Sequence, residues 1–135
     1  MRREVTSAPT GRVAVKRVTV ANDSGLVINP GNLRLVIEGN VIQGLSRTLH
    51  EEVTFDRNMV TANDWVSYPI LEIGEAPDAI DILLVGSQST PPGGSGEPAL
   101  VCMPSAVANA IFNATGTRIR RFPFTAERVK KALTA

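Results

Sequence analysis

The chain has 135 residues, of which 43% are hydrophobic and 20% are charged, with a net charge of +1 and one cysteine. This length suits one domain with a sizeable core, and the composition excludes a disordered chain. The near-neutral charge argues against a nucleic-acid partner, and a single cysteine excludes an internal disulfide and an iron–sulfur cluster held by this chain alone. Cys102 is expected to be a small buried hydrophobe, and no apolar run is long enough to predict a membrane span.

The first eleven residues are polar and include a proline and a glycine, which predicts a mobile lead-in over residues 1–11. Order is therefore expected to begin at Arg12, in a single domain over residues 12–135. The N-terminal arginines are not followed by an apolar region, so no signal peptide is complete. A cytoplasmic location is the default expectation, and a periplasmic one is the alternative if the chain belongs to a longer exported assembly.

Valines dominate the run from Val13 to Val20, which predicts a strand. The pair Lys16-Arg17 interrupts the alternation of apolar and polar residues. This interruption indicates either a β-bulge or a strand at the edge of its sheet. A turn is expected at residues 22–25, where the sequence reads Asn-Asp-Ser-Gly.

Asn29 is followed by a proline, a pairing typical of a helix N-terminus. Apolar residues then recur at three- and four-residue steps, which predicts an amphipathic helix over about residues 30–51. The apolar positions are Leu33, Val36, Ile37, Val41, Leu45 and Leu49. Gly39 and Gly44 lie inside this helix, where a glycine costs roughly 1 kcal/mol relative to alanine, so each needs a packing or ligand reason.

His50, the only histidine, lies beside two glutamates near the end of this helix. A surface position with a favourable helix-dipole interaction is expected, because a lone histidine makes no metal site. Residues 53–55 and 59–61 predict two short strands around a turn. Residues 79–85 alternate in a β-rich run that predicts the best core strand of the chain.

The segment 91–96 reads Pro-Pro-Gly-Gly-Ser-Gly and leads directly to Glu97 and Pro98. Glycines let the backbone approach a ligand without a Cβ in the way. Pro98 suits a first helical position, which places Glu97 at the start of a helix. On spacing alone, a carboxylate there is most often a helix-capping group that gains roughly 0.3 to 1 kcal/mol from the helix dipole.

The helix after this carboxylate should end at Gly116, a suitable left-handed cap, and should open either near Ala99 or at Pro104. Residues 118–124 carry three arginines in an extended piece, which is more typical of a solvated face than of a phosphate site. Thr125 should cap a last short helix. Together these elements predict an α+β fold with a small mixed or antiparallel sheet, two main helices and a short C-terminal helix.

Several segments also resemble one protein family. They read Ile-Glu-Gly-Asn-Val-Ile-Gln-Gly-Leu at 37–45, Tyr-Pro at 68–69, Ser-Gly-Glu-Pro-Ala at 95–99 and Ala-Asn-Ala-Ile-Phe-Asn-Ala-Thr-Gly at 108–116. These sequence motifs are similar to the C-terminal end of the large subunit of the molybdenum hydroxylases, the xanthine dehydrogenase and aldehyde oxidase family. The isoquinoline 1-oxidoreductase β-subunit type is the branch it most resembles. The segment 21–25 departs from the Val-Asp-Cys-Gly wording usual there.

The resemblance implies a molybdopterin-type molybdenum cofactor and hydroxylation of an N-heterocycle or an aldehyde with water-derived oxygen. Glu97 would be the general base, and Gln43 would lie at the molybdenum ligand sphere, although its pattern alone is more typical of a solvated helix residue. Gly44, Ser95 and Gly96 would be further cofactor-binding positions, with no metal ligand supplied by this chain. The implied partners are the remainder of the large subunit and an iron–sulfur small subunit.

The resemblance covers only the final part of a much longer subunit, so the domain is expected to be a fragment of a larger molybdopterin-binding domain. An isolated fragment should be inactive, should lack the cofactor and should self-associate through its uncovered apolar surface. The alternative is a non-catalytic chain, either a truncated remnant or a structural piece that completes a split large subunit.

Overall fold

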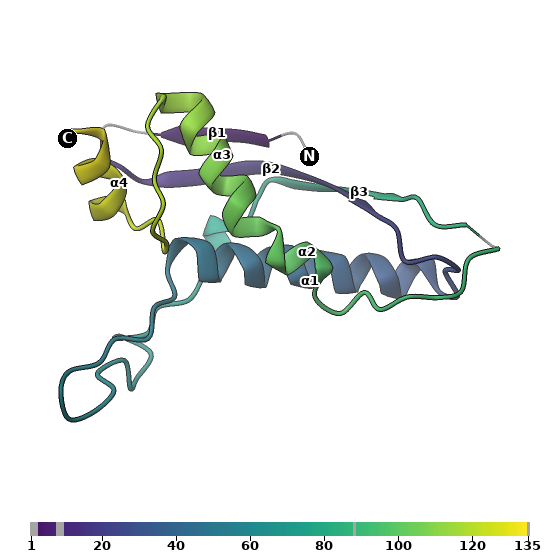
Figure 1. Cartoon of the computed structure of the whole chain (residues 1–135), viewed down its shortest axis with the longest axis horizontal. Coiled ribbons are helices and arrows are strands. Elements are labelled where there is room, and N and C mark those ends of the chain that lie inside the picture. Colours follow the sequence, from purple (N-terminus) through teal and green to yellow (C-terminus); the bar gives the residue numbers. More distant parts are fainter. Residues whose placement is uncertain (1–2, 8–9, 88, 135) are drawn as a thin grey trace.

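The computed structural model describes residues 3–7, 10–87 and 89–134. Its centre is a sheet of three strands in the order β1 (Arg3–Ser7), β2 (Val13–Asn22) and β3 (Ala79–Leu84) (Figure 1). Strand β1 pairs with β2 antiparallel, and β2 pairs with β3 parallel. The sheet is therefore mixed. Together with the helices described in the next paragraphs, it confirms the predicted α+β fold.

Strand β1 lies inside the stretch that the sequence favours as a lead-in, so regular structure begins before Arg12. Its pairing runs from Arg3 opposite Val18 to Ser7 opposite Val13. The residues of β1 are mostly polar and give little sign of a strand. The strand forms because β2 supplies its hydrogen-bond partners. Positions 1, 2, 8 and 9 of the predicted lead-in lie outside the described residues.

Strand β2 carries the predicted interruption as a β-bulge. Glu4 pairs with Arg17 and Val5 with Val15, so Lys16 is skipped in the ladder. Burial of alternate residues resumes at Val18 in the opposite phase and continues to Asn22. The edge alternative is wrong, because β2 is the central strand of the sheet.

Helix α1 (Pro30–Leu49) connects the two parallel strands, as a parallel pair requires. Asn29 caps it as predicted, with its Oδ1 accepting a hydrogen bond from the N–H of Asn32 at 3.0 Å. The helix buries the predicted stripe at Ile37, Val41, Leu45 and Leu49. Val36 was expected on this stripe but is exposed.

Two strand predictions need correction. Residues 53–55 and 59–61 form only an isolated bridge between Phe55 and Val60 rather than two strands. Strand β3 is an edge strand whose residues are half-buried or exposed, with Leu83 exposed, so it is not the buried core strand expected. Burial of the sheet is concentrated on β2, which has a neighbour on each side.

The chain after Glu97 forms two helices, α2 (Pro98–Val101) and α3 (Met103–Thr115). Both predicted starts contribute, because a first turn opens at Pro98 and Pro104 lies in the first turn of α3. Gly116 ends α3 with φ of +73°, as predicted. Helix α4 (Ala126–Leu133) follows, capped by Thr125, with Glu127 in its first turn and lysines in its last.

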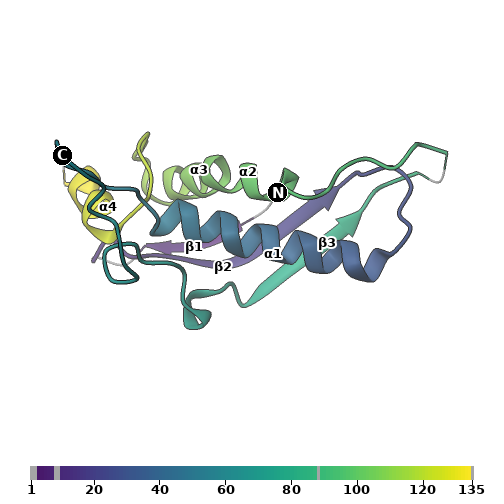
Figure 2. The same cartoon turned by 90° about the horizontal axis from the view of Figure 1, so that it is seen from below.

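Helices α1, α2 and α3 lie over one face of the sheet, and α4 lies at the end of the sheet where β2 begins (Figure 1 and Figure 2). Helix α3 packs against β1 and helix α1 against β3, and the two helices contact each other (Figure 2). The core between these layers combines valines of β2 with apolar residues of α1 and α3, including Met103, Val107 and Ile111. Within the described residues, no helix has both the length and the apolar character needed to cross a bilayer.

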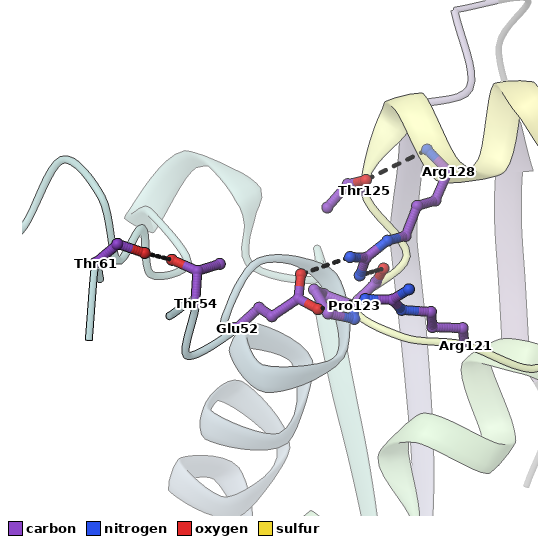
Figure 3. Close-up of polar contacts among 7 residues, drawn as sticks. All are labelled: Glu52, Thr54, Thr61, Arg121, Pro123, Thr125 and Arg128. Carbon is purple, nitrogen blue, oxygen red and sulfur yellow. Dashed lines mark hydrogen bonds and ion pairs between the residues drawn. The ribbon is translucent and has the colours of Figure 1, made fainter. Parts of the chain in front are cut away.

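A polar cluster ties the C-terminal segment to the end of α1 (Figure 3). Glu52 accepts hydrogen bonds from Arg128 at 2.6 Å and from Arg121 at 3.1 Å, and Arg128 also donates to the carbonyl of Pro123. Nearby, the N–H of Phe124 donates to the carbonyl of Thr48 at 2.7 Å. These contacts fix the point from which residues 53–66 leave the body of the molecule (Figure 1).

Candidate functional site

The glycine loop, residues 91–96, lies against the turn that follows β2. The N–H of Gly93 donates to the carbonyl of Ser24 at 2.8 Å, and the N–H of Leu26 donates to the carbonyl of Thr90 at 2.9 Å. Gly25 has φ of +67°, and a Cβ there would collide with the carbonyl oxygen of Pro91. Since β2 and β3 are parallel, the loop is held near the carboxyl ends of both strands, where ligand sites of parallel sheets commonly form.

Glu97 follows this loop as the residue that precedes α2. Its side chain is exposed and makes no hydrogen bond to the helix N–H groups, so it is not a hydrogen-bonded cap. Its exposed position at the helix start agrees with the dipole interaction expected from spacing alone. Only its backbone carbonyl takes part in the helix, as acceptor from the N–H of Val101 at 3.3 Å. The carboxylate is therefore available to act on a bound molecule.

The loop itself has a surface that a ligand could meet. A Cβ added at Gly94 or at Gly96 would meet no atom within 4 Å, so the backbone there is open on that side. Ser95 lies between them, and its Oγ is shielded from solvent with no hydrogen-bond partner in the described part of the chain. An orphaned buried hydroxyl and two open backbone positions fit a cofactor rich in hydrogen-bonding groups.

A cavity of about 310 Å³ lies between the C-terminal half of β2 and the start of α2, where Pro98, the residue after Glu97, forms part of its wall. Among the described residues, β1 pairs with β2 as far as Val18, and residues of β2 beyond that point line the cavity. Its walls include Asn22, Pro98 and Cys102. Cys102 is exposed, so the expectation of a buried cysteine is wrong. The cavity leaves room for a ligand at the start of α2.

Gln43 and Gly44 lie next to each other on α1 but face different surroundings. Gln43 is exposed, as a ligand-contacting residue of an open site would be. Gly44 is buried, and a Cβ there would lie 2.6 Å from Cγ of Met103 and 3.0 Å from the carbonyl oxygen of Leu100. Gly44 thus lets α1 approach the chain three residues after Glu97, which is a packing role. It leaves no open space at that position for a cofactor.

Asn40 is a polar residue of the site region that the sequence analysis does not single out. It lies one turn before Gly44 and is buried, with Nδ2 donating to the carbonyl of Val36 at 2.7 Å. Its Oδ1 is shielded from solvent and has no partner among the described residues. The sequence sign of its burial was its position: Asn40 lies three residues after Ile37 and next to Val41, both on the apolar stripe of the helix.

His50 is half-buried rather than a surface residue, with Nε2 lying 3.1 Å from Oε2 of Glu75. Glu75 also pairs with Arg12, at 3.1 Å, so this cluster joins the end of α1 to the start of β2. Across the described ranges, no three or more histidine, cysteine, aspartate or glutamate side chains are arranged to hold a metal ion. A metal carried by a separate cofactor would not need such a cluster.

Comparison with known proteins identifies relatives. A family model described as molybdopterin cofactor-binding domain matches residues 4–77. A nicotinate dehydrogenase subunit of Pseudomonas putida is 51% identical over 124 residues, which are 92% of this chain and 10% of that protein. The β-subunit of isoquinoline 1-oxidoreductase from Brevundimonas diminuta is 32% identical over 111 residues, 82% of this chain and 14% of that protein.

A solved structure, the aldehyde oxidoreductase from Desulfovibrio gigas, has the same fold with a TM-score of 0.85 and 33% identity. The likeness covers 98% of this chain and 15% of that one. The chain therefore spans about a tenth to a seventh of the length of these relatives.

Proposed function

Because the chain belongs to the molybdopterin cofactor-binding domain family, we propose that it is the C-terminal portion of a molybdenum hydroxylase large subunit and carries its general base, Glu97. The observation that supports this most directly is the exposed carboxylate at the end of the glycine loop. It makes no capping hydrogen bond, and the next residue, Pro98, lines a cavity of about 310 Å³.

The cofactor, when bound, supplies the redox chemistry that lets an oxygen atom derived from water be added to a carbon of the substrate. Glu97 accepts the proton that must leave this oxygen as it attacks. A carboxylate does so efficiently only when its affinity for the proton is close to that of the group it deprotonates.

The binding role falls to the glycine loop and to α1. Ser95 offers its orphaned Oγ, and the open backbone at Gly94 and Gly96 allows close approach of a ligand. Gln43 offers an exposed amide, which can donate and accept hydrogen bonds without carrying charge. Gly44 supports the site indirectly by allowing α1 to pack against the start of α3.

The substrate class we propose is an aromatic N-heterocycle or an aldehyde. The names of the relatives point to molecules of this kind, namely nicotinate, isoquinoline and aldehydes. The partners we propose are the remaining part of the large subunit and an iron–sulfur subunit that removes electrons. A chain with one cysteine cannot hold a four-cysteine cluster by itself.

Cofactor retention tests the binding role of Gln43. The chain replaces the matching 124 residues of the Pseudomonas putida relative, and molybdenum per chain and melting temperature are measured in this chimaera. Gln43→Ala should lower cofactor affinity about 10- to 100-fold with little change in the melting temperature of the cofactor-free protein. Glu38→Ala, at an exposed position of the same helix, is the matched control and should change neither.

Equal cofactor retention in the two variants would remove Gln43 from the site. A loss of melting temperature in the cofactor-free chimaera that matches the loss of cofactor would make Gln43 a structural helix residue. A folded chimaera without molybdenum would favour the non-catalytic remnant instead.

A further inference from the structure

Residues 53–66, here called the projecting loop, extend away from the body of the molecule (Figure 1). The loop exposes an unusual set of large apolar side chains. Trp65 is 83% exposed, Val66 90% and Phe55 76%, and Met59 and Val60 are also exposed. Single apolar residues on a surface are ordinary, but a cluster of aromatic and aliphatic side chains in one loop marks an interaction surface.

The exposure does not come from a lack of structure in the loop. Thr61 donates through both its N–H and its hydroxyl to Thr54, each at 2.8 Å, as the hydroxyl contact in Figure 3 shows. Oδ1 of Asp56 accepts from the N–H groups of Asn58 at 2.7 Å and Met59 at 3.0 Å. The polar groups thus hold the loop in one shape while its apolar side chains point to solvent.

Both ends of the loop are also anchored to the body. Glu52, just before the loop, is held by Arg121 and Arg128 (Figure 3). After the loop, the hydroxyl of Tyr68 donates to Glu51 at 2.9 Å, and the N–H of Leu71 donates to Oγ of Ser46. An anchored and internally bonded loop presents a preformed surface, which lowers the entropy cost of binding.

The charges of the loop bear on what could cover it. Backbone N–H groups of Asn58 and then Met59 hold the pKa of Asp56 below its ordinary value. The Ser67 hydroxyl and N–H do the same for the pKa of Asp64. Both aspartates therefore stay ionised at neutral pH. Arg57 lies between them in the sequence, so the loop combines its apolar surface with charges of both signs.

The relatives suggest which surface covers the loop. In the aldehyde oxidoreductase structure, a fold that matches 98% of this chain makes up only 15% of a single polypeptide. We propose that the projecting loop docks this domain onto an apolar surface of the remaining polypeptide of the large subunit, with Phe55, Trp65 and Val66 as the anchoring side chains. This inference rests on the proposed function, because it names the surface through which that subunit is completed.

Hydroxyl-radical footprinting with mass spectrometry tests the proposal, since methionine and aromatic side chains are reactive probes. Modification rates of Met59 and Trp65 are compared between the isolated chain, diluted until it is monomeric, and the chimaera with the Pseudomonas putida relative described above. The expected result is at least a fivefold lower rate for both residues in the chimaera. Equal rates in the two proteins would overturn the proposal.

A paired substitution provides a second readout. Trp65→Asp and Val66→Asp should leave the melting temperature of the isolated chain unchanged, because both side chains are already in water there. The same changes in the chimaera should lower its melting temperature or prevent its assembly. No effect of these substitutions in the chimaera would overturn the proposal. Protection of the loop only when the isolated chain self-associates would also overturn it, because the occupant would then be a second copy of this chain.

These outcomes can be separated from a failure of the proposed function. Loop protection is measured without reference to molybdenum or turnover. A chimaera with a protected loop and no cofactor would support the docking surface and contradict the catalytic role, whereas an active chimaera with an exposed loop would do the reverse.

Discussion

Substitution by alanine at two glycines of the same helix should change the stability of the fold in opposite directions. Gly39 and Gly44 both lie inside α1, and a Cβ at Gly39 would meet nothing within 4 Å. Gly39→Ala should therefore stabilise the fold by about 1 kcal/mol, the ordinary difference in helix propensity. At Gly44 the new Cβ would lie 2.6 Å and 2.9 Å from Cγ and Cβ of Met103, a fully buried residue, so the core must shift.

The size of the difference follows from these contacts. The propensity gain is common to both substitutions and cancels when they are compared. What remains is the cost of overpacking a filled core, which is typically about 1 to 3 kcal/mol. Gly44→Ala should thus be less stable than Gly39→Ala by about 1 to 3 kcal/mol.

Urea unfolding followed by far-ultraviolet circular dichroism measures this difference directly. It is best done in the chimaera, or with the isolated chain at fixed concentration, because self-association changes apparent stability. Equal free energies of unfolding for the two variants would refute the packing role of Gly44. A Gly44→Ala variant that keeps its stability but loses cofactor would instead make Gly44 a ligand-contacting residue.

Two further predictions concern charge and assembly. Hydrogen bonds from Arg128 and then Arg121 hold the pKa of Glu52 below its ordinary value. Glu52 therefore stabilises the fold above its unfolded-state pKa and loses this contribution as pH falls through the lowered folded-state pKa. The melting temperature of the wild type should exceed that of Glu52→Gln at pH 7 and converge with it in acid; a pH-independent difference would contradict this interpretation. The isolated chain should carry no stoichiometric molybdenum and should self-associate, so a monomer with one molybdenum per chain, seen by light scattering and elemental analysis, would contradict the fragment interpretation.

Elements defined by neighbouring residues could be predicted from the sequence. The start of α1 at Asn29, the end of α3 at Gly116 and the start of α4 at Thr125 depend on capping residues that lie next to these helices in the sequence. The buried stripe of α1 follows from its helical period. The bulge in β2 was one of two interpretations of Lys16-Arg17, and only the position of the strand in the sheet could decide between them.

Features that depend on distant partners could not be predicted. Strand β1 exists because β2 supplies its hydrogen bonds, and its own residues are mostly polar. Strand β3 has an apolar sequence that suits a core, yet it lies at the edge of the sheet and exposes Leu83. Its apolar character is consistent with cover supplied from outside this domain.

The candidate site likewise combines features that the local sequence indicates with features that depend on distant residues. Glu97 and the glycine loop could be recognised from the wording of one short segment. The hydrogen bond that holds this loop to Ser24, about seventy residues earlier in the chain, could not be predicted from that segment. Gly44 drew attention as a helix glycine, but the packing reason for it, a contact with Met103, lies about sixty residues later in the chain.

A comparison of two carboxylates in turnover decides whether Glu97 is the base of the reaction. Turnover of the molybdenum-loaded chimaera is measured for Glu97→Gln and for Glu127→Gln, which removes another exposed carboxylate from the first turn of a helix. With molybdenum content unchanged in both, Glu97→Gln should lose at least about 10²-fold in turnover, the usual contribution of a positioned base. Glu127→Gln should keep full turnover. Activity of Glu97→Gln within about tenfold of the wild type, at equal molybdenum content, would contradict the account.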